Sequence, residues 1–268
     1  MAKRFVASAI ISVGNCFKYL LHELSEADGQ GWIFWLKAAI LAGGAGTRLY
    51  PITAYVPKAL IPIGNRYVIE YIIDYLKHHG INDVVMLISE NEFELIRNHL
   101  GDGSRFGVGV EYSAAERIGT AGALGAAADL LGERFVLYYG DVLTNMDLKG
   151  MIDFHMKNKA ACTLAMSTTV PMDYGLARVA EDGRVTFFEE KPILKEYPVS
   201  MGIDIVEKDE IIPYCKPKMD FAKHVVPNLL ATRKAVFAYL TEKRHYDIGT
   251  FKSLEEAREL LERNKTLF

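Results

Sequence analysis

The chain has 268 residues, of which 50% are hydrophobic and 24% are charged, and its formal net charge is −3. This is the balance of an ordinary soluble protein, without the strong positive field of proteins that bind nucleic acid in bulk. Three widely spaced cysteines without a C-x-x-C pair argue against a disulfide framework or a zinc site. We therefore expect a reducing, cytoplasmic location and no nucleic-acid partner.

The first 35 residues combine a basic start with an apolar stretch from Phe5 to Val13. This segment resembles a weak signal peptide, but it is far too short to span a bilayer, and no clean A-x-A cleavage site follows it. We expect neither secretion nor a membrane partner.

From residue 36 onward, predicted strands and helices alternate. Apolar runs predict strands at 36–42, 83–88, 108–112 and 134–139, and helical periodicity predicts helices at 66–79, 91–100 and 121–131. This alternation predicts an α/β fold with right-handed crossovers and a Rossmann-like, mostly parallel sheet flanked by helices. Ligands of such sheets bind beyond the carboxyl ends of the strands.

The second half of the chain is richer in predicted strands. Strands are expected at 161–169, 199–206 and 235–239, with a hairpin of 175–180 and 184–189 around Asp182-Gly183, and a charged helix at 252–264. No long linker or repeat separates this part, so we expect one compact domain.

The stretch Leu41–Leu49, LAGGAGTRL, follows the first of these strands directly. Leu49 stands where a dinucleotide-binding G-x-G-x-x-G would need glycine, and the chain has no Gly-Lys pair for a Walker loop. A backbone amide nest remains, with Arg48 at its end and Lys58 ten residues later, which together suit a polyphosphate. A tight turn with two solvated cations is the alternative that the residues leave open.

Seven motifs, taken together and in order, resemble the sugar-1-phosphate nucleotidyltransferases, also called NDP-sugar pyrophosphorylases. They are ILAGGAGTRLYPIT, VPKALIPIGNRYVIEYIIDYL, GDGSRFGVGVEYS, IGTAGALGAA, YYGDV, FFEEKP and HYDIGTFKSLEEA, covering about residues 36–262. The resemblance implies a glycosyltransferase-A-like nucleotidyltransferase fold over residues 36–268. Residues 1–35 would then be an N-terminal extension outside the catalytic core, with a native appendage that packs through Trp32, Phe34 and Trp35 as the alternative. We expect a chain that starts at Leu36, replaced by methionine, to keep its activity.

The family reaction joins a nucleoside triphosphate to a sugar 1-phosphate and releases pyrophosphate. By resemblance, Arg48 neutralises the leaving phosphates, Lys58 contacts the α-phosphate and the sugar phosphate, and Asp141 and Asp247 hold Mg²⁺. The nucleotide-binding residues implied are Leu41, Ala42, Gly43, Gly44, Gly46, Thr47, Gly119, Thr120 and Gly122. Thr120 as the cap of a helix remains an alternative compatible with that role.

On the sugar side, the resemblance assigns Glu190 to the sugar hydroxyls and Lys191 to the sugar phosphate, while Gly175 and Gly202 let the backbone approach the sugar ring. Ordinary turn glycine is the alternative for the last two. One departure is His245, where many relatives have tryptophan, and its effect on the fit of the sugar is open.

The runs GTAG and MDFAKHVVPNLL look more like the mannose-1-phosphate guanylyltransferase branch, which favours GTP and mannose 1-phosphate. Glucose 1-phosphate with dTTP or UTP is the alternative. Two other classes fit the sequence less well. The full set of charged residues disfavours a non-catalytic NDP-sugar sensor, and the D-x-D motif of a glycosyltransferase is missing. No hexapeptide repeat follows, so we expect no β-helix trimer, and a homo-oligomer of another kind stays open.

Overall fold

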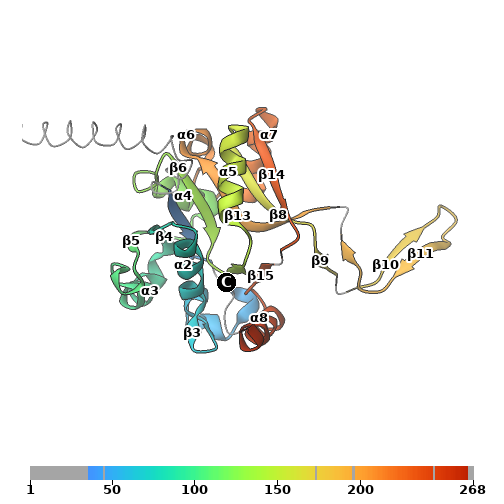
Figure 1. Ribbon diagram of the computed structural model, residues 1–268, viewed down its shortest axis with the longest axis horizontal. Coiled ribbons are helices and arrows are strands. Elements are labelled where there is room, and N and C mark those ends of the chain that lie inside the picture. The colour runs from blue at the N-terminus through green and yellow to red at the C-terminus, as the bar shows by residue number, and fades with distance from the viewer. Residues whose placement is uncertain (1–35, 45, 173, 195–196, 244, 265–268) are drawn as a thin grey trace, which may run out of the picture. The chain divides into compact units, whose positions relative to one another are not determined.

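The computed structural model describes residues 36–44, 46–172, 174–194, 197–243 and 245–264 (Figure 1). The chain divides between Leu36 and Lys37, and the unit from Lys37 onward is described here by itself. The predicted extension, residues 1–35, lies outside the described residues.

A seven-stranded sheet forms the centre of this unit, in the order β14-β8-β13-β6-β1-β4-β5. Four of its pairings are parallel, and only β13 runs antiparallel to its two neighbours. The predicted mixed, mostly parallel α/β sheet is confirmed. The strands are β1 (Lys37–Leu41), β4 (Asp83–Ser89), β5 (Gly109–Ala115), β6 (Arg134–Tyr139), β8 (Cys162–Ser167), β13 (Val199–Glu207) and β14 (Val236–Thr241).

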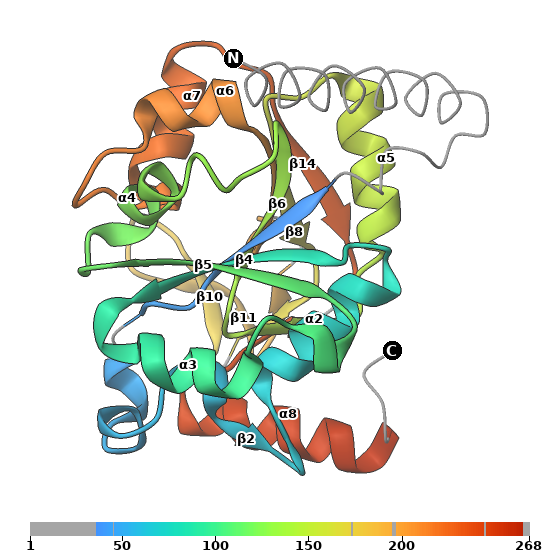
Figure 2. The ribbon, with the colours of Figure 1, turned by 90° about the vertical axis from the view of Figure 1, so that its left-hand side faces the viewer.

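Helices cover both faces of the sheet, which is why the central strands are apolar on both sides. One face packs against α4 (Gly119–Ala126), α6 (Lys208–Ile211) and α7 (Val226–Ala231), and the other against α2 (Val68–His78) and α5 (Leu148–Asn158). Figure 2 shows α4, α6 and α7 on the opposite side of the strands from α5. The remaining helices are α3 (Phe93–Leu100) and α8 (Phe251–Asn264).

Four two-stranded pairs complete the unit: β2 (Pro62–Ile63) with β3 (Arg66–Tyr67), β7 (Val142–Thr144) with β15 (His245–Asp247), β9 (Val170–Pro171) with β12 (Ile193–Leu194), and β10 (Leu176–Val179) with β11 (Val185–Glu189). The hairpin β10–β11 turns at Gly183, as Asp182-Gly183 predicts, and extends away from the central sheet (Figure 1).

Two helices near the middle of the chain are among the elements that depart from the sequence-based expectation. The helix expected at 121–131 begins two residues earlier and already ends at Ala126. Helix α5 was not predicted, although Asp147 caps it by accepting a hydrogen bond from the amide of Gly150 at 3.0 Å. No helix in the described part of the chain is long and apolar enough to cross a membrane.

Candidate active site

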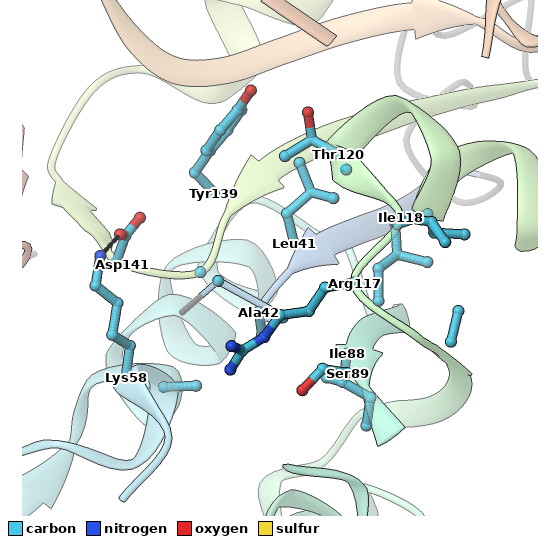
Figure 3. A pocket seen from close by; sticks show the side chains of 18 of the residues that line it. Leu41, Ala42, Lys58, Ile88, Ser89, Arg117, Ile118, Thr120, Tyr139 and Asp141 are labelled. Atoms are coloured by element: carbon cyan, nitrogen blue, oxygen red, sulfur yellow. Dashed lines mark hydrogen bonds and ion pairs between the residues drawn. The ribbon is translucent and has the colours of Figure 1, made fainter. Parts of the chain in front are cut away.

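A cavity of about 370 Å³ opens at the carboxyl ends of four neighbouring strands, β6, β1, β4 and β5 (Figure 3). This is the edge at which a parallel sheet is expected to bind its ligand. Its wall is formed by Leu41, Ala42, Gly43, Gly44, Lys58, Ala59, Leu87, Ile88, Ser89, Ala115, Glu116, Arg117, Ile118, Gly119, Thr120, Ala123, Tyr139, Gly140, Asp141 and Asp220.

The glycine loop forms one side of this cavity. The loop begins at the end of β1 and contacts the end of the neighbouring strand β4, where the Ala42 amide donates to the carbonyl of Leu87 at 2.8 Å. A Cβ atom on Gly43 would lie 2.9 Å from the amide nitrogen of Ser89, so only glycine lets the loop approach β4 so closely. Gly46 and Thr47 lie outside the cavity wall, and Gly46 adopts a left-handed backbone conformation with φ 59°.

Lys58 and Asp141 meet in the cavity wall. The Lys58 ammonium donates to the Asp141 carboxylate, and both side chains are largely buried, with 14% and 22% of their surface exposed. Pro57 precedes the short 3₁₀ turn Lys58–Leu60, and Asp141 follows β6 after Gly140. The lysine predicted to contact the phosphates and one of the two aspartates predicted to hold Mg²⁺ are therefore in contact.

Asp247 lies beside Asp141 because β15 pairs with β7. In that register Asp247 is opposite Val142, and the Ile248 amide donates to the Asp141 carbonyl at 2.7 Å. Asp247 Oδ2 accepts from Arg48 Nη2 at 3.3 Å. Asp247 Oδ1 is buried and has no hydrogen-bond partner among the described residues. Arg48 and Asp247 thus extend the charged cluster next to the cavity.

Thr120 connects helix α4 to the π-helical turn Phe221–Val225. Its hydroxyl donates to Asp220 Oδ2 at 2.9 Å and accepts from the Phe221 amide at 2.7 Å. Ile118 occupies the N-cap position of α4, so the alternative that Thr120 caps this helix is wrong. Gly122 lies against Pro217, where a Cβ atom would be 3.1 Å from the proline Cα, and it does not line the cavity.

The residues predicted for the sugar side do not line this cavity. Gly175 and Glu190 flank the hairpin β10–β11 and lie together: a Cβ atom on Gly175 would be 2.9 Å from Glu190 Oε2. Lys191 follows with a left-handed φ of 48°. Gly202, on β13, lies against the ring of Tyr139. Their roles stay predictions.

Among the cavity residues that were not singled out from the sequence, the polar ones are Ser89, Glu116, Arg117, Tyr139 and Asp220. Ser89 and Tyr139 end β4 and β6, so the rule that ligands bind at carboxyl strand ends could have found them. Burial raises the pKa of the Tyr139 phenol, which therefore stays protonated at neutral pH. Arg117 and Asp220 lie in irregular segments that carry no such signal. Within the described residues, no group of three or more histidine, cysteine or acidic side chains gathers as a metal cluster.

Comparisons with known proteins show the family of this chain. The family model described as nucleotidyl transferase matches residues 37–264, and the chain belongs to this family, which confirms the resemblance seen in the sequence. The low-salt glycan biosynthesis nucleotidyltransferase Agl11 of Haloferax volcanii is 31% identical over 87% of this chain and 68% of its own length. The UTP–glucose-1-phosphate uridylyltransferase of Synechocystis is 30% identical over 80% of this chain, which spans only 60% of that relative.

Solved structures share the fold. A Bacillus anthracis protein assigned as a glucose-1-phosphate thymidylyltransferase, in complex with sucrose, superposes with a TM-score of 0.68 at 28% identity, covering 84% of this chain and 94% of that one. HddC from Yersinia pseudotuberculosis, complexed with GMP-PN, gives 0.67 at 23% identity, covering 84% and 99%. The similarity to HddC shows a shared fold and nothing more.

Proposed function

We propose that this protein transfers a nucleotidyl group from a nucleoside triphosphate to a sugar 1-phosphate, giving an NDP-sugar and pyrophosphate. Membership of the nucleotidyl transferase family and the named relatives support this class of reaction. The observation that carries the proposal is the contact between Lys58 and Asp141 in the cavity beside the glycine loop, with Asp247 held next to Asp141.

In this reaction an oxygen of the sugar phosphate attacks the α-phosphorus, and the bond to the bridging oxygen of the β-phosphate breaks as pyrophosphate leaves. Two anions must approach each other, so a cation between them lowers the barrier. Lys58 would draw the α-phosphate and the sugar phosphate together, and Arg48 would neutralise the pyrophosphate. Positioning and charge provide the catalysis, and no side-chain nucleophile is required.

The acidic residues fit Mg²⁺. Asp247 offers a buried carboxylate oxygen without a partner among the described residues, and Asp141 lies beside it, directly before the paired strand β7, which matches the hard oxygen ligands that Mg²⁺ prefers. We propose that Asp141 and Asp247 would hold this ion, which withdraws negative charge from the α-phosphate when bound. Lys58 and Arg48 are the present partners of these two carboxylates, and both cations would then turn to the phosphates.

The substrates we favour are GTP and mannose 1-phosphate, on the family pattern of the GTAG and MDFAKHVVPNLL runs. Glucose 1-phosphate with dTTP or UTP is the alternative, and the names of the Synechocystis and Bacillus anthracis proteins lend it support. On the sugar side, Glu190, Lys191, Gly175 and Gly202 keep their proposed roles. The adjacency of Gly175 and Glu190 supports their action on the same ligand.

A matrix assay tests the function. Each nucleoside triphosphate is combined with each sugar 1-phosphate and Mg²⁺, and pyrophosphate release is measured. We expect release with GTP and mannose 1-phosphate, and a loss of at least about 100-fold in Asp141→Asn. The exposed Asp153 on α5 offers a matched control, since Asp153→Asn removes the same charge far from the cavity. Release with no pair at all would refute the proposed activity.

A further inference from the structure

Arg117 follows β5, the last of the four strands whose ends form the cavity, whereas Asp141 follows β6 at the other end of this strand order. These four strands lie in the order β6-β1-β4-β5, with Asp141 after β6 and Arg117 after β5. Neighbouring strands lie about 4.8 Å apart, so the two strand ends are separated by roughly 14 Å. If the phosphates bind beside Lys58, the nucleoside extends toward Arg117.

The guanidinium of Arg117 is available for a ligand. Its side chain is 53% exposed, and its only ion-pair partner among the described residues is Glu92 Oε1, at a distance of 4.0 Å. Figure 3 shows the side chain reaching from the β5–α4 loop into the cavity. By contrast, Lys58 already donates to Asp141. Arg117 therefore has donors to spare, whereas Lys58 is engaged at the phosphate end.

Apolar side chains form the walls around this end of the cavity. They are Leu41, Leu87, Ile88, Ala115, Ile118 and Ala123, and the polar residues Ser89, Glu116 and Thr120 line the same part of the wall. Such walls bury the faces of a flat ring, and a few placed polar groups then have to recognise its edge. Among the described residues that line this end of the cavity, Arg117 carries the positive charge. Its guanidinium therefore suits a base whose edge is rich in hydrogen-bond acceptors.

We infer that Arg117 recognises the base of the nucleotide by donating two hydrogen bonds to O6 and N7 of guanine. This inference rests on the proposed nucleotidyl transfer. The fork of a guanidinium matches these two adjacent acceptors, whereas thymine offers O4 beside a methyl group and uracil offers O4 beside a C–H. Arg117 thus favours GTP over dTTP and UTP, and it does so without contacting the reacting phosphates.

The test removes either the guanidinium of Arg117 or the N7 acceptor of the guanine base. Wild-type protein, Arg117→Ala and Arg117→Lys are assayed with GTP, 7-deaza-GTP, dTTP and UTP, and mannose 1-phosphate is the sugar substrate in each assay. We expect Arg117→Ala to lower kcat/KM for GTP about tenfold or more, as loss of a bidentate pair predicts, with little change for dTTP and UTP. Wild type should lose a similar factor with 7-deaza-GTP, which lacks N7, while Arg117→Ala should treat both purines alike.

Arg117→Lys should resemble Arg117→Ala, because a point charge does not reproduce the fork. Arg105, on the 3₁₀ turn Ser104–Phe106 outside the cavity, offers a control of equal charge, and Arg105→Ala should leave the preference for GTP unchanged. Equal losses for all nucleotides in Arg117→Ala would show contact with the shared triphosphate and overturn the inference.

Binding of GDP, dTDP and UDP, measured by calorimetry, separates this inference from the proposed activity. A protein that releases no pyrophosphate would refute the activity, yet selective weakening of GDP binding in Arg117→Ala would still support the role of Arg117. Wild-type protein that binds dTDP or UDP more tightly than GDP would contradict that role even if transfer occurs.

Discussion

Lys58 and Asp141, 83 positions apart in the chain, form an ion pair in the wall of the cavity. Beside it, Arg48 pairs with Asp247 at 3.3 Å. Two cations and two carboxylates thus balance each other before any substrate binds. In the proposed function, a triphosphate with its metal would bring the opposite partner for each group, so the cluster could exchange partners without leaving a charge unpaired.

The first prediction concerns Lys58. Replacing it by methionine removes the cation that would join the two phosphates, and we expect kcat to fall by about 10²- to 10³-fold. Pyrophosphate release under saturating substrates measures this. Lys157→Met, on the exposed side of α5, removes the same charge and should keep full activity. Unchanged kcat in Lys58→Met would exclude Lys58 from catalysis.

The second prediction compares two glycines of the loop. A Cβ atom on Gly43 would meet the backbone of Ser89 at 2.9 Å and of Ile88 at 3.2 Å, whereas one on Gly44 would meet nothing within 4 Å. Gly43→Ala should therefore lower the free energy of unfolding by about 1–3 kcal/mol through crowding. Gly44→Ala should stay within about 0.5 kcal/mol of wild type. Urea titration checks both, and equal stabilities would show that the loop does not need its close approach to β4.

The third prediction concerns the link between Thr120, Asp220 and the Phe221 amide. Thr120→Val keeps the shape of the side chain and leaves two part-buried polar groups without their partner. We expect a loss of about 1–3 kcal/mol in unfolding free energy and weaker nucleotide binding, since both Thr120 and Asp220 line the cavity. Thr120→Ser retains the hydroxyl and should recover most of the loss; a serine variant as unstable as valine would point to packing instead.

The fourth prediction concerns Asp204, a buried carboxyl group on β13 whose Oδ1 has no hydrogen-bond partner in the described part of the chain. Burial raises its pKa from 3.8 to about 8, so the folded state keeps a proton that the unfolded state releases near pH 4. Stability should therefore fall as pH rises from about 4 to about 8 and then level off, by an amount on the order of a few kcal/mol.

Asp204→Asn removes this titration and keeps the size of the side chain. We expect the variant to be more stable than wild type at pH 8.5, with a smaller difference at pH 5. Urea unfolding at the two pH values measures this difference. A gap between the two proteins that does not vary with pH would mean that Asp204 is not protonated in the folded state.

Much of the fold could be predicted because its signals are local. The apolar run of β1, the helical stripe of α2 and the turn at Asp182-Gly183 all depend on residues within a few positions of each other. The alternation of these elements then restricts the sheet to a mostly parallel arrangement. The location of the site at the carboxyl strand ends followed from the same reasoning, and Gly43 and Asp141 both lie there.

The sequence by itself therefore determined the fold class, the glycine loop and, through its ordered motifs, the family. Only the tertiary structure decided which distant side chains meet: Asp247 reaches Asp141 through the register of β15 on β7, and Arg117 enters the cavity from the loop after β5. The physical reason is the distance along the chain over which each signal acts. Periodicity and turn chemistry act between near neighbours, whereas the partners of a charged side chain depend on strand order, register and packing across the whole unit.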